Sequence, residues 1–388
     1  MNETTSAVVK GQTFRKVIFL VPRYHTNMMG WVKGLKEHSV DCEVWVRNLG
    51  ISEDYANLKP RVISSSTLYV EKTKSIRNIC KRFFKLRSLL IESNPNFVIC
   101  RLELKLYDIW QVINVRSSKI PFILYSQWPI NGLKGNRKYL RALVCKLLSV
   151  KFFSPVKSTE TDWCFDSKDG DGLSKINFIP FAIETSNLPN HQSRYETNAS
   201  IKSLNLLSIG KFQSRKNHLE LVQYFLANKL LISNGATLTI IGEVSTKEHK
   251  YNYDFLIDTL SRSSLGNRVK VLVNVPYKEC QSLLSSCDIF LLFSDKEPAS
   301  VSNLEAMSMG KMVIIRSKNG TANYVRHLHG GFIVESIIQL DNIFTSIISD
   351  PSIILEMGQY NKSTIKEFCD PLKVTSKIIS MFDFYPSK

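Results

Sequence analysis

Short apolar runs rich in β-branched residues alternate with amphipathic stretches of helical length from one end of the chain to the other. The runs are continuous rather than alternating in polarity, which is typical of parallel strands buried on both faces. Strands that alternate with helices predict right-handed βαβ units, and therefore an α/β fold class. The expected strands are 16–21, 42–46, 61–70, 97–101, 120–125 and 176–180 in the first half, and 204–209, 237–241, 269–273, 289–293, 312–315 and 332–334 in the second.

A segment poor in large apolar residues separates the two sets of strands. Residues 184–203 are rich in Ser, Asn and Pro and predict an interdomain linker. The 388 residues are also too many for one ordinary domain. We therefore expect two doubly wound, Rossmann-like domains facing across a cleft, over residues 1–183 and 204–369, with ligands at the carboxyl ends of the strands.

The composition is that of an ordinary globular protein, but the charge is uneven. Hydrophobic residues make up 44% and charged residues 22%, which excludes the disordered and fibrous classes. The 51 Lys and Arg exceed the 34 Asp and Glu by 17, and residues 1–150 alone hold 25 basic and 10 acidic side chains. No apolar run approaches the ~20 residues that cross a bilayer, and the N-terminus lacks a signal-peptide pattern. We therefore expect a cytoplasmic protein.

Neither the cysteines nor the histidines predict a metal site. The eight cysteines lie far apart without a CxxC pair, which favours buried free thiols over disulfides or zinc. The seven histidines show no zinc spacing. Asp169 and Asp171 could suggest a metal-binding pair, but they lie in a glycine-rich stretch with no strand before it, which favours a solvated turn.

The predicted strand 204–209 runs into a glycine followed by three cations. Gly210 permits a sharp turn, and Lys211, Arg215 and Lys216 lie within six residues at the carboxyl end of the strand. With the N-terminus of the following helix, these cations can neutralise a diphosphate. A solvated basic turn is the alternative for this segment on its own. The GxGxxG and P-loop patterns are both missing here, so those two nucleotide sites are excluded.

Two glutamates separated by seven residues follow another predicted strand of the second half. Glu297 is expected in a loop, and Glu305 about one turn into a helix that opens near Ser300, Val301 and Ser302. The segment therefore presents helix N–H groups, which suit a phosphate, between two carboxylates. Carboxylates accept hydrogen bonds from vicinal hydroxyls. One of the two glutamates is therefore suited to bind a sugar and the other to bind a ribose. A surface loop with an acid at a helix N-terminus is the alternative.

Five short blocks within residues 200–340 resemble the retaining GT-B glycosyltransferases, in particular the large family 4 grouping (glycosyl transferases group 1), and they lie in the same order as in that family. The first half is similar only around 21–30 and 177–181. The resemblance implies a GT-B fold in which the chain end, here an expected helix over 370–384, rejoins the first domain. The five blocks are 210–216, 273–277, 287–290, the pair Glu297 and Glu305, and 330–334.

The resemblance implies roles for residues of the second domain. Lys211 and Lys216 match the two basic positions that hold the donor diphosphate, although the first is usually arginine, and Arg215 is expected to share that load. Glu297 matches the carboxylate near the reacting carbon of the donor sugar and is the expected catalytic residue, through positioning and electrostatic support. Glu305 matches the carboxylate that binds the ribose hydroxyls.

The resemblance also implies how the leaving group is stabilised. Backbone N–H groups around Ser300, Val301 and Ser302 complete the expected phosphate site, and Val275 is expected near the base. Fixed cations and helix N–H groups stabilise a departing diphosphate without a metal or other cofactor. In this family the acceptor hydroxyl attacks from the side of the leaving group, so the anomeric configuration is retained.

Candidate residues of the first domain are assigned to the acceptor side of the cleft. His25, Asn27 and Gly30 follow the first strand, and the glycine is expected to allow a close approach to the donor. Arg101 ends the fourth strand where many relatives carry a histidine, and an arginine cannot act as a base near neutral pH. Trp128 follows the fifth strand and is expected to line the acceptor site.

The sequence thus predicts a metal-independent glycosyltransferase that uses a UDP-, GDP- or other nucleotide-sugar donor. The expected acceptor is a glycan or a lipid-linked sugar, in the synthesis of a cell-surface polysaccharide. A nucleotide-sugar epimerase or hydrolase of the same fold is an alternative, and its reaction would need no acceptor. A basic nucleic-acid-binding protein is the alternative from another class, and its binding would not need Glu297 and Glu305.

Two basic segments of the first domain suggest a second partner. Residues 72–90 and 134–153 contain no acid, and apolar residues interleave with their cations at helical spacing. Basic amphipathic helices are attracted to anionic membrane surfaces. Core-packing helices with a solvated basic face are the alternative, and no recognised motif supports nucleic acid. We therefore expect a peripheral protein on the inner face of a membrane.

Overall fold

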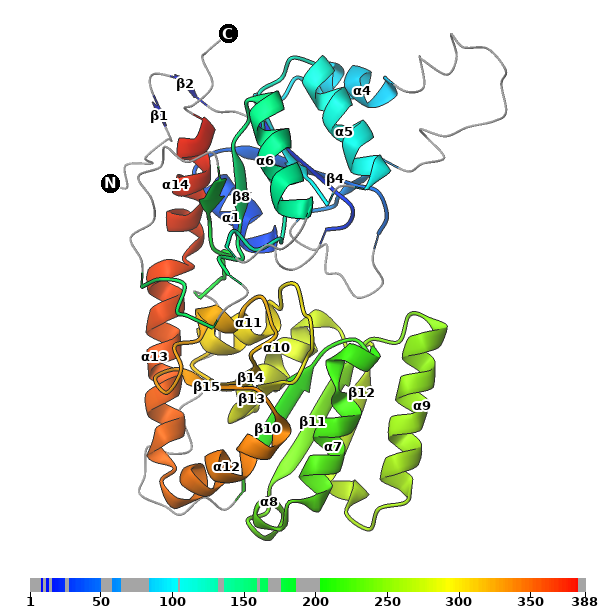
Figure 1. The fold of residues 1–388 in the computed structure, drawn as a ribbon, viewed down its shortest axis with the longest axis vertical. Helices are drawn as coiled ribbons and strands as arrows, with labels where there is room; N and C mark the ends of the chain where they lie inside the picture. Colours follow the sequence, from blue (N-terminus) through cyan, green and yellow to red (C-terminus); the bar gives the residue numbers. More distant parts are fainter. Residues whose placement is uncertain are drawn as a thin grey trace. The chain divides into compact units, whose positions relative to one another are not determined.

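The computed structural model divides the chain into two compact units (Figure 1). Unit 1 consists of Met1–Pro155, Asp169–Ala182 and Cys369–Lys388, and unit 2 of Val156–Lys168 and Ile183–Phe368. The residues that the structure describes are 8–9, 12–13, 16–24, 28–49, 58–63, 84–103, 105–131, 136–158, 161–166, 176–185 and 203–382. Most of the expected linker, 186–202, lies outside them.

Unit 1 is built on a parallel sheet of seven strands in the order β5-β4-β3-β6-β7-β8-β9. Chain order reverses between β3 and β6, which makes the sheet doubly wound. A short antiparallel pair, β1 (Val8–Val9) and β2 (Gln12–Thr13), precedes it. The seven strands are β3 (Lys16–Val21), β4 (Asp41–Val46), β5 (Arg61–Val62), β6 (Phe97–Arg101), β7 (Phe122–Tyr125), β8 (Phe152–Ser154) and β9 (Ile176–Phe178).

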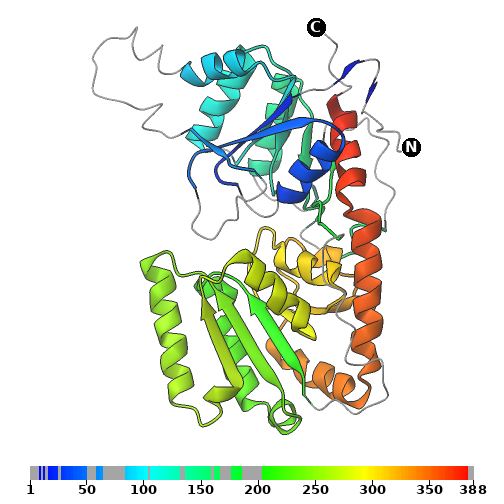
Figure 2. The ribbon, with the colours of Figure 1, turned by 180° about the vertical axis from the view of Figure 1, so that it is seen from behind.

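Helices cover both faces of this sheet. Three of them lie on one face (Figure 1), and α1 packs beside α14 on the other (Figure 2). The first group consists of α4 (Lys85–Ser93), α5 (Leu106–Ser117) and α6 (Asn136–Leu148), and the second of α1 (Met29–Glu37) and α14 (Pro371–Phe382). This layering follows from the right-handed crossovers that join parallel strands on either side of the reversal.

The apolar runs form strands because both faces of the sheet are buried. All of Val17–Val21 is buried, as a strand between two helical layers requires. The sequence missed β8, which is only three residues long and follows a basic helix closely. The expected strand 61–70 is observed as Arg61–Val62, and 64–70 lie outside the described residues.

Unit 2 is built on a parallel sheet of six strands in the order β12-β11-β10-β13-β14-β15. Numbered along the unit, this is the order 3-2-1-4-5-6 of the dinucleotide-binding folds. The strands are β10 (Asn205–Ile209), β11 (Thr237–Gly242), β12 (Val269–Val273), β13 (Ile289–Leu292), β14 (Met312–Arg316) and β15 (Gly331–Val334). All six were predicted within two residues at each end, so the α/β class is confirmed.

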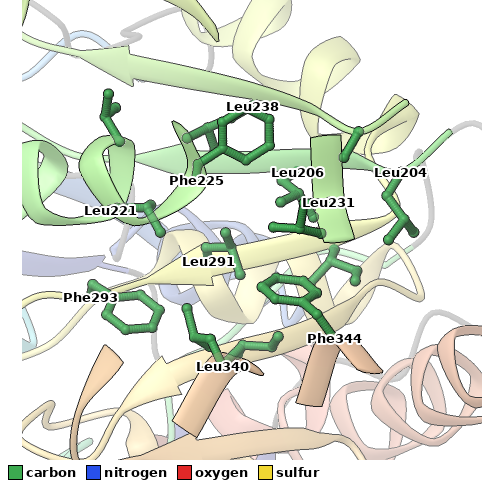
Figure 3. Packing of buried hydrophobic residues seen from close by; sticks show 14 of the residues in the cluster. Leu204, Leu206, Leu221, Phe225, Leu231, Leu238, Leu291, Phe293, Leu340 and Phe344 are labelled. Carbon is green, nitrogen blue, oxygen red and sulfur yellow. The ribbon is translucent and has the colours of Figure 1, made fainter. Parts of the chain in front are cut away.

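The main core of unit 2 fills one side of its sheet. Leu206, Leu238 and Leu291 project from three neighbouring strands and pack against Phe225 of α7 and Phe344 of α12 (Figure 3). The α-helices of unit 2 are α7 (His218–Ala227), α8 (Lys229–Ser233), α9 (Lys247–Ser261), α10 (Tyr277–Ser286), α11 (Ser302–Ser308), α12 (Leu340–Ser349) and α13 (Ser352–Phe368), and the 3-10 helices are η2 (Ser214–Lys216), η3 (Gly266–Arg268), η4 (Ala322–Tyr324) and η5 (Ile337–Gln339).

Residues 156–168 pack with unit 2 although they precede the expected linker. The Phe165 ring stacks on Phe368 with ring centroids 4.3 Å apart, and the Cys164 amide donates to the carbonyl of Asn323 at 2.8 Å. The seven described cysteines are free, and all except Cys280 are buried, as expected. Among the described helices, none has both the length and the hydropathy that crossing a bilayer requires.

The last helix, α14, belongs to unit 1. It starts at Pro371, where the missing N–H costs nothing, and Asp370 Oδ1 accepts the Lys373 amide at 3.0 Å. Helix α1 approaches it closely at Gly34, since a Cβ there would lie 2.3 Å from the Pro371 carbonyl oxygen. The packing of the chain end onto unit 1 therefore depends on a glycine near the start of the chain.

We expect Gly34→Ala to lower the stability of unit 1. The clash with Pro371 should cost about 1–3 kcal/mol, more than the ~1 kcal/mol gained in helix propensity. Thermal unfolding followed by circular dichroism measures the effect. Lys36→Ala, at an exposed position of the same helix, is the matched control and should change little. A Gly34→Ala protein as stable as the wild type would contradict the close packing.

Candidate active site

The strand order of unit 2 reverses between β10 and β13. The strands β11 and β12 extend the sheet on one side of this point, and β14 and β15 extend it on the other. In open α/β sheets, ligands bind outside the carboxyl ends of the strands at such a switch point. The segments that follow β10 and β13 therefore define the candidate site.

The loop after β10 is a compact turn that carries the cations. Gly210 lies against the aliphatic part of Lys216, because a Cβ at Gly210 would lie 3.1 Å from the lysine Cδ. The turn η2 then contains Arg215 and Lys216, and Asn217 adopts a left-handed conformation (φ 54°) before α7 begins. Asparagine tolerates this conformation better than most residues. The local sequence thus fixes both cations in one short turn.

Hydrogen bonds fasten this turn to the loop after β13. The Asn217 side chain donates to Asp295 Oδ2 at 3.0 Å, and the Asp295 amide donates to the Arg215 carbonyl at 2.7 Å. Arg316 Nη1, from the end of β14, donates to Asp295 Oδ2 at 3.3 Å and to Glu220 Oε2 at 3.0 Å. The two loops of the switch point therefore form one connected unit.

Glu297 lies at the centre of the site and is buried. Its amide donates to the Lys318 carbonyl at 3.3 Å, and its carbonyl accepts the Gly320 amide at 2.8 Å. Its carboxylate forms an ion pair with Lys216 Nζ at 2.6 Å and accepts a hydrogen bond from the Arg215 guanidinium. The structure thus brings together three of the predicted residues, with the carboxylate neutralised by two cations.

The loop after β14 packs against the backbone of Glu297 and Pro298 and holds that segment in place. A Cβ at Gly320 would lie 1.8 Å from the Pro298 carbonyl oxygen, so the two backbones approach as closely as only glycine allows. The buried Thr321 hydroxyl lies 2.8 Å from Asn319 Oδ1 and 3.0 Å from Asn303 Oδ1, and thereby links this loop to α11.

Burial lowers the pKa of two basic residues of the site, Lys216 and His218. It lowers the pKa of Lys216, and Glu297 opposes this shift as the counter-ion. Burial also lowers the pKa of the neighbouring His218 to about 4, so this imidazole is neutral near neutral pH. The positive charge of the inner site therefore comes from Lys216 and Arg215.

Lys211 has a different partner. Its Nζ lies 3.0 Å from Glu243 Oε1, which follows β11 and also accepts the Ser245 hydroxyl at 2.5 Å. Lys211 is more exposed than Lys216. The third predicted cation therefore lies beside the same strand edge, but it does not pair with Glu297.

The second glutamate occupies the first turn of α11, as predicted. Helix α11 begins at Ser302, Val301 precedes it as N-cap, and the hydroxyls of Ser300 and Ser302 hydrogen-bond at 2.9 Å. Glu305 Oε1 accepts the Tyr277 hydroxyl at 2.8 Å. Burial raises the pKa of Glu305 above that of an ordinary glutamate.

Val275 lies in the loop between β12 and α10. Asn274 beside it is left-handed (φ 53°), and its side chain accepts the Val244 amide at 2.9 Å and donates to the Val244 carbonyl at 3.2 Å. The Val275 carbonyl accepts the Cys280 thiol at 3.6 Å. These contacts fasten the loop after β12 to the loop after β11.

Sequence reasoning missed several residues that complete the site. Glu243, Asp295 and Tyr277 pair with predicted residues or hold their loops together. One signal could have found the first two, since each is an acidic residue within three positions of the carboxyl end of a strand of the same parallel sheet. The pairing of Tyr277 with Glu305 could not be found in this way, because it joins the first residue of one helix to another helix.

Two described candidates of unit 1 follow neighbouring strands: Arg101 ends β6, at the switch point of this sheet, and Trp128 follows β7. Arg101 is buried; its guanidinium pairs with Glu103 and donates to Gln127 Oε1 at 3.3 Å. The Trp128 amide donates to the Ser126 hydroxyl at 2.9 Å. Arg101 is therefore already engaged by a carboxylate.

Gly30 lies in α1 rather than in the preceding loop. A Cβ there would lie 2.0 Å from the Ala182 carbonyl oxygen, so packing within unit 1 is sufficient reason for a glycine. His25 and Asn27 lie outside the described residues, as do Asp169 and Asp171. Within the described parts of the chain, no three or more His, Cys, Asp or Glu side chains are grouped so that they could hold a metal ion.

Comparison with known sequences points to one family. Residues 192–364 match the family described as "Glycosyl transferases group 1". A search of curated proteins finds no match. The matched segment contains the whole of the candidate site.

Solved structures of similar fold cover nearly the whole chain. HepE from Anabaena, in complex with UDP and glucose, has a TM-score of 0.71 at 15% identity, covering 96% of this chain and 100% of that one. A glycosyltransferase from Rickettsia africae has a TM-score of 0.69 at 14% identity, covering 95% and 98%. Sucrose-phosphate synthase from Thermosynechococcus elongatus has 0.67 at 13%, covering 95% and 99%. Identities this low show the fold alone, and the expected two-domain GT-B fold is confirmed.

We expect Thr321→Val to destabilise unit 2 by about 1–3 kcal/mol. The substitution keeps the shape of the side chain but removes the buried hydroxyl between Asn319 and Asn303. Thermal unfolding measures the loss. Thr259→Val on α9, whose hydroxyl donates to the Phe255 carbonyl at the surface, is the control and should be nearly neutral. Equal effects of both substitutions would show that Thr321 does not support the site.

Proposed function

We propose that this chain, whose residues 192–364 form a glycosyl transferases group 1 domain, is a glycosyltransferase that moves a sugar from a nucleotide-diphosphate donor to an acceptor hydroxyl. The observation that carries the proposal is the ion-pair group at the switch point of unit 2, in which the buried Glu297 pairs with the buried Lys216 and with the partly exposed Arg215. Two cations at the carboxyl edge of a parallel sheet suit a diphosphate, and the carboxylate between them suits a sugar that develops positive charge.

The ion pairs indicate how the donor would enter. A diphosphate offers Arg215 and Lys216 more negative charge than one carboxylate does, so it would replace Glu297 as their partner. Glu297 would then be available to the sugar. Lys211 would leave Glu243 in the same way, and the N–H groups at Ser300, Val301 and Ser302 would complete the phosphate contacts.

Glu305 is the proposed ribose ligand. Glu305 is half-buried, and its carboxylate already accepts one hydroxyl, that of Tyr277, as it would accept a ribose hydroxyl. Val275, in the loop after β12, is proposed to lie near the base. HepE was solved with UDP, with UDP-glucose and with UDP and glucose, which makes UDP the first nucleotide to test.

The proposed reaction needs no metal and retains the anomeric configuration. Cleavage of the bond between the anomeric carbon and the diphosphate leaves an oxocarbenium-like sugar and an anionic leaving group. Lys216 and Arg215 would stabilise the leaving group as fixed charges, and the burial of Lys216 makes its charge more effective than stabilisation by water. Glu297 would stabilise the cationic sugar, and the acceptor hydroxyl would attack from the side that the leaving group vacates.

Unit 1 is the proposed acceptor domain, through Arg101, Trp128 and Gly30, together with His25 and Asn27. Its excess of cations suits an anionic acceptor or its surroundings. We propose a glycan or lipid-linked acceptor, a role in cell-surface polysaccharide synthesis, and a place at the cytoplasmic face of a membrane. Donor turnover that needs no acceptor would instead indicate a hydrolase or an epimerase.

Substitutions in the ion-pair group should separate catalysis from binding. We expect Glu297→Gln to lower kcat by about 100-fold or more, because it removes the charge that stabilises the sugar cation. UDP should bind to this variant at least as tightly as to the wild type, since two cations lose their competing partner. Lys216→Ala should weaken UDP binding roughly 10- to 100-fold. Calorimetry gives Kd, and release of UDP in the presence of acceptor gives kcat.

Asp258→Asn is the matched control for Glu297→Gln, because Asp258 also pairs with an arginine, Arg262, but does so on the exposed surface of α9. It should leave kcat and Kd within a few-fold of the wild type. Turnover that survives in Glu297→Gln, or UDP binding that survives in Lys216→Ala, would overturn the role assigned to that residue.

The affinity for UDP should fall as the pH is lowered. A ribose donates to the ionised Glu305 carboxylate, and protonation removes acceptor capacity. Because burial raises the pKa of Glu305, the loss should begin at a higher pH than an ordinary glutamate, with a pKa of about 4.3, would give. Calorimetric titrations across this range test the expectation. Glu305→Gln should bind more weakly at neutral pH, and its pH dependence should be smaller. An unchanged pH profile in this variant would contradict the assignment.

A further inference from the structure

Helices α5 and α6 of unit 1 expose apolar side chains on their outer faces. Leu106, on α5, is 88% exposed, and on α6 Tyr139 is 76% and Leu147 70% exposed. The surface defined by these side chains and their neighbours is called the α5–α6 face, and each of its seven large apolar members is at least 40% exposed. They are Leu106, Ile109 and Ile113 of α5 and Tyr139, Leu140, Leu143 and Leu147 of α6.

These residues form rows, and the rows face away from the core. The positions on α5 follow helical spacing, and Tyr139, Leu143 and Leu147 are four residues apart on α6. Both helices already bury another side, through Val112 and Val115 on α5 and Cys145 on α6. Since α5 joins β6 to β7 and α6 joins β7 to β8, the two helices are neighbours on the same face of the sheet (Figure 1).

The polarity of α6 is reversed at one position. Arg141 is only 4% exposed; its guanidinium donates to the carbonyls of Pro129 at 2.7 Å and Ile130 at 2.9 Å and lies over the Phe152 ring. A helix on a water-facing surface turns cations outward and leucines inward. Here an arginine points inward while three leucines of the same helix are exposed, as a helix facing an apolar medium requires.

The charged residues of the face are of one sign. Its exposed cations lie on the same two helices as the apolar rows or next to the helix ends, whereas Asp108, the only acid among residues 105–131 and 136–158, is buried and accepts the backbone amides of Glu103 and Lys105. Glu103, just outside this stretch, pairs with Arg101 and Lys105. No exposed acid in those ranges would repel an anionic partner. The exposed cations are Lys105, Arg116, Lys119, Lys138 and Lys146.

Helix α9 of unit 2 provides a contrast within the same chain. It also exposes large apolar residues, Tyr251 at 71% and Phe255 at 49%. Its cations, however, pair with acids on the same helix, as Lys250 does with Asp254. Exposed apolar residues alone therefore do not distinguish the α5–α6 face; their combination with exposed cations, and with no exposed acid on either helix, does.

We propose that the α5–α6 face rests on an anionic lipid bilayer. The leucines and isoleucines would enter the boundary between headgroups and acyl chains, and Tyr139 would lie at headgroup level with the lysines against lipid phosphates. A second copy of the chain fits less well, because two faces of the same sign repel each other. Nucleic acid fits less well because only Tyr139 among the seven apolar residues could stack on a base. The α5–α6 face would hold unit 1 at the membrane face named in the proposed function, on which this assignment rests, and it takes no part in donor binding.

Vesicle flotation of the full chain tests the proposal. The wild type should bind vesicles of phosphatidylcholine with about 30% phosphatidylglycerol and should bind pure phosphatidylcholine much less. The double substitution of Lys138 and Lys146 to Gln should weaken binding roughly 5-fold per lysine, since each cation near an anionic surface contributes about 1 kcal/mol. The double substitution of Leu143 and Leu147 to Ser should weaken binding further, even at low salt.

The matched control is the double substitution of Tyr251 and Phe255 to Ser on α9, which removes similar apolar area beside balanced charges and should leave binding unchanged. Equal binding by all variants, or no preference for the anionic vesicles, would overturn the proposal. So would a dimer in light scattering that the Leu143 and Leu147 substitutions dissociate. UDP affinity, measured on the same proteins, should be unchanged by every surface substitution, so a failure here is distinguishable from a failure of the donor site.

Discussion

The ion pair between Lys216 and Glu297 is the interaction on which the organisation of unit 2 depends. A buried ammonium without a counter-ion is unstable, and burial already lowers the pKa of this lysine. The two residues come from loops about eighty positions apart, so the pair requires that both loops hold fixed positions. The contact of Asn217 with Asp295 and the close approach at Gly320 meet that requirement. Much of the polar structure around the site follows from keeping one cation and one carboxylate together.

The same pair gives the site its capacity to respond to a ligand. Replacing a single buried partner leaves an uncompensated charge, whereas an incoming anion can take over the cation and release the carboxylate at the same time. Glu243 with Lys211, and Tyr277 with Glu305, repeat this arrangement at the edges of the site. The side chains predicted to bind the donor phosphates and the ribose, Lys211, Arg215, Lys216 and Glu305, are therefore each engaged by another side chain of unit 2.

The excess of basic residues has two distinct explanations in this molecule. Cations at the switch point of unit 2 are few, and most of their charge is offset by carboxylates. Those on and beside α5 and α6 are exposed, and the one acid of these two helices, Asp108, is buried; the leucines of α6 face outward while Arg141 faces inward. The first group suits a small anion that enters a fixed site. The second suits an extended surface, because its charges are spread over two helices and no side chain fixes their geometry.

The sequence by itself determined the alternation of strands and helices, the division into two sheets, and the positions of Glu297, Glu305 and the basic turn. These are local properties, because periodicity and turn chemistry act over a few neighbouring residues. Only the tertiary structure decided which groups meet: that Lys216 pairs with Glu297 but Lys211 with Glu243, that Gly30 serves packing against Ala182, and that the leucines of α6 face outward. These pairings depend on strand order and on the approach of distant loops, and no short stretch of sequence encodes either of them.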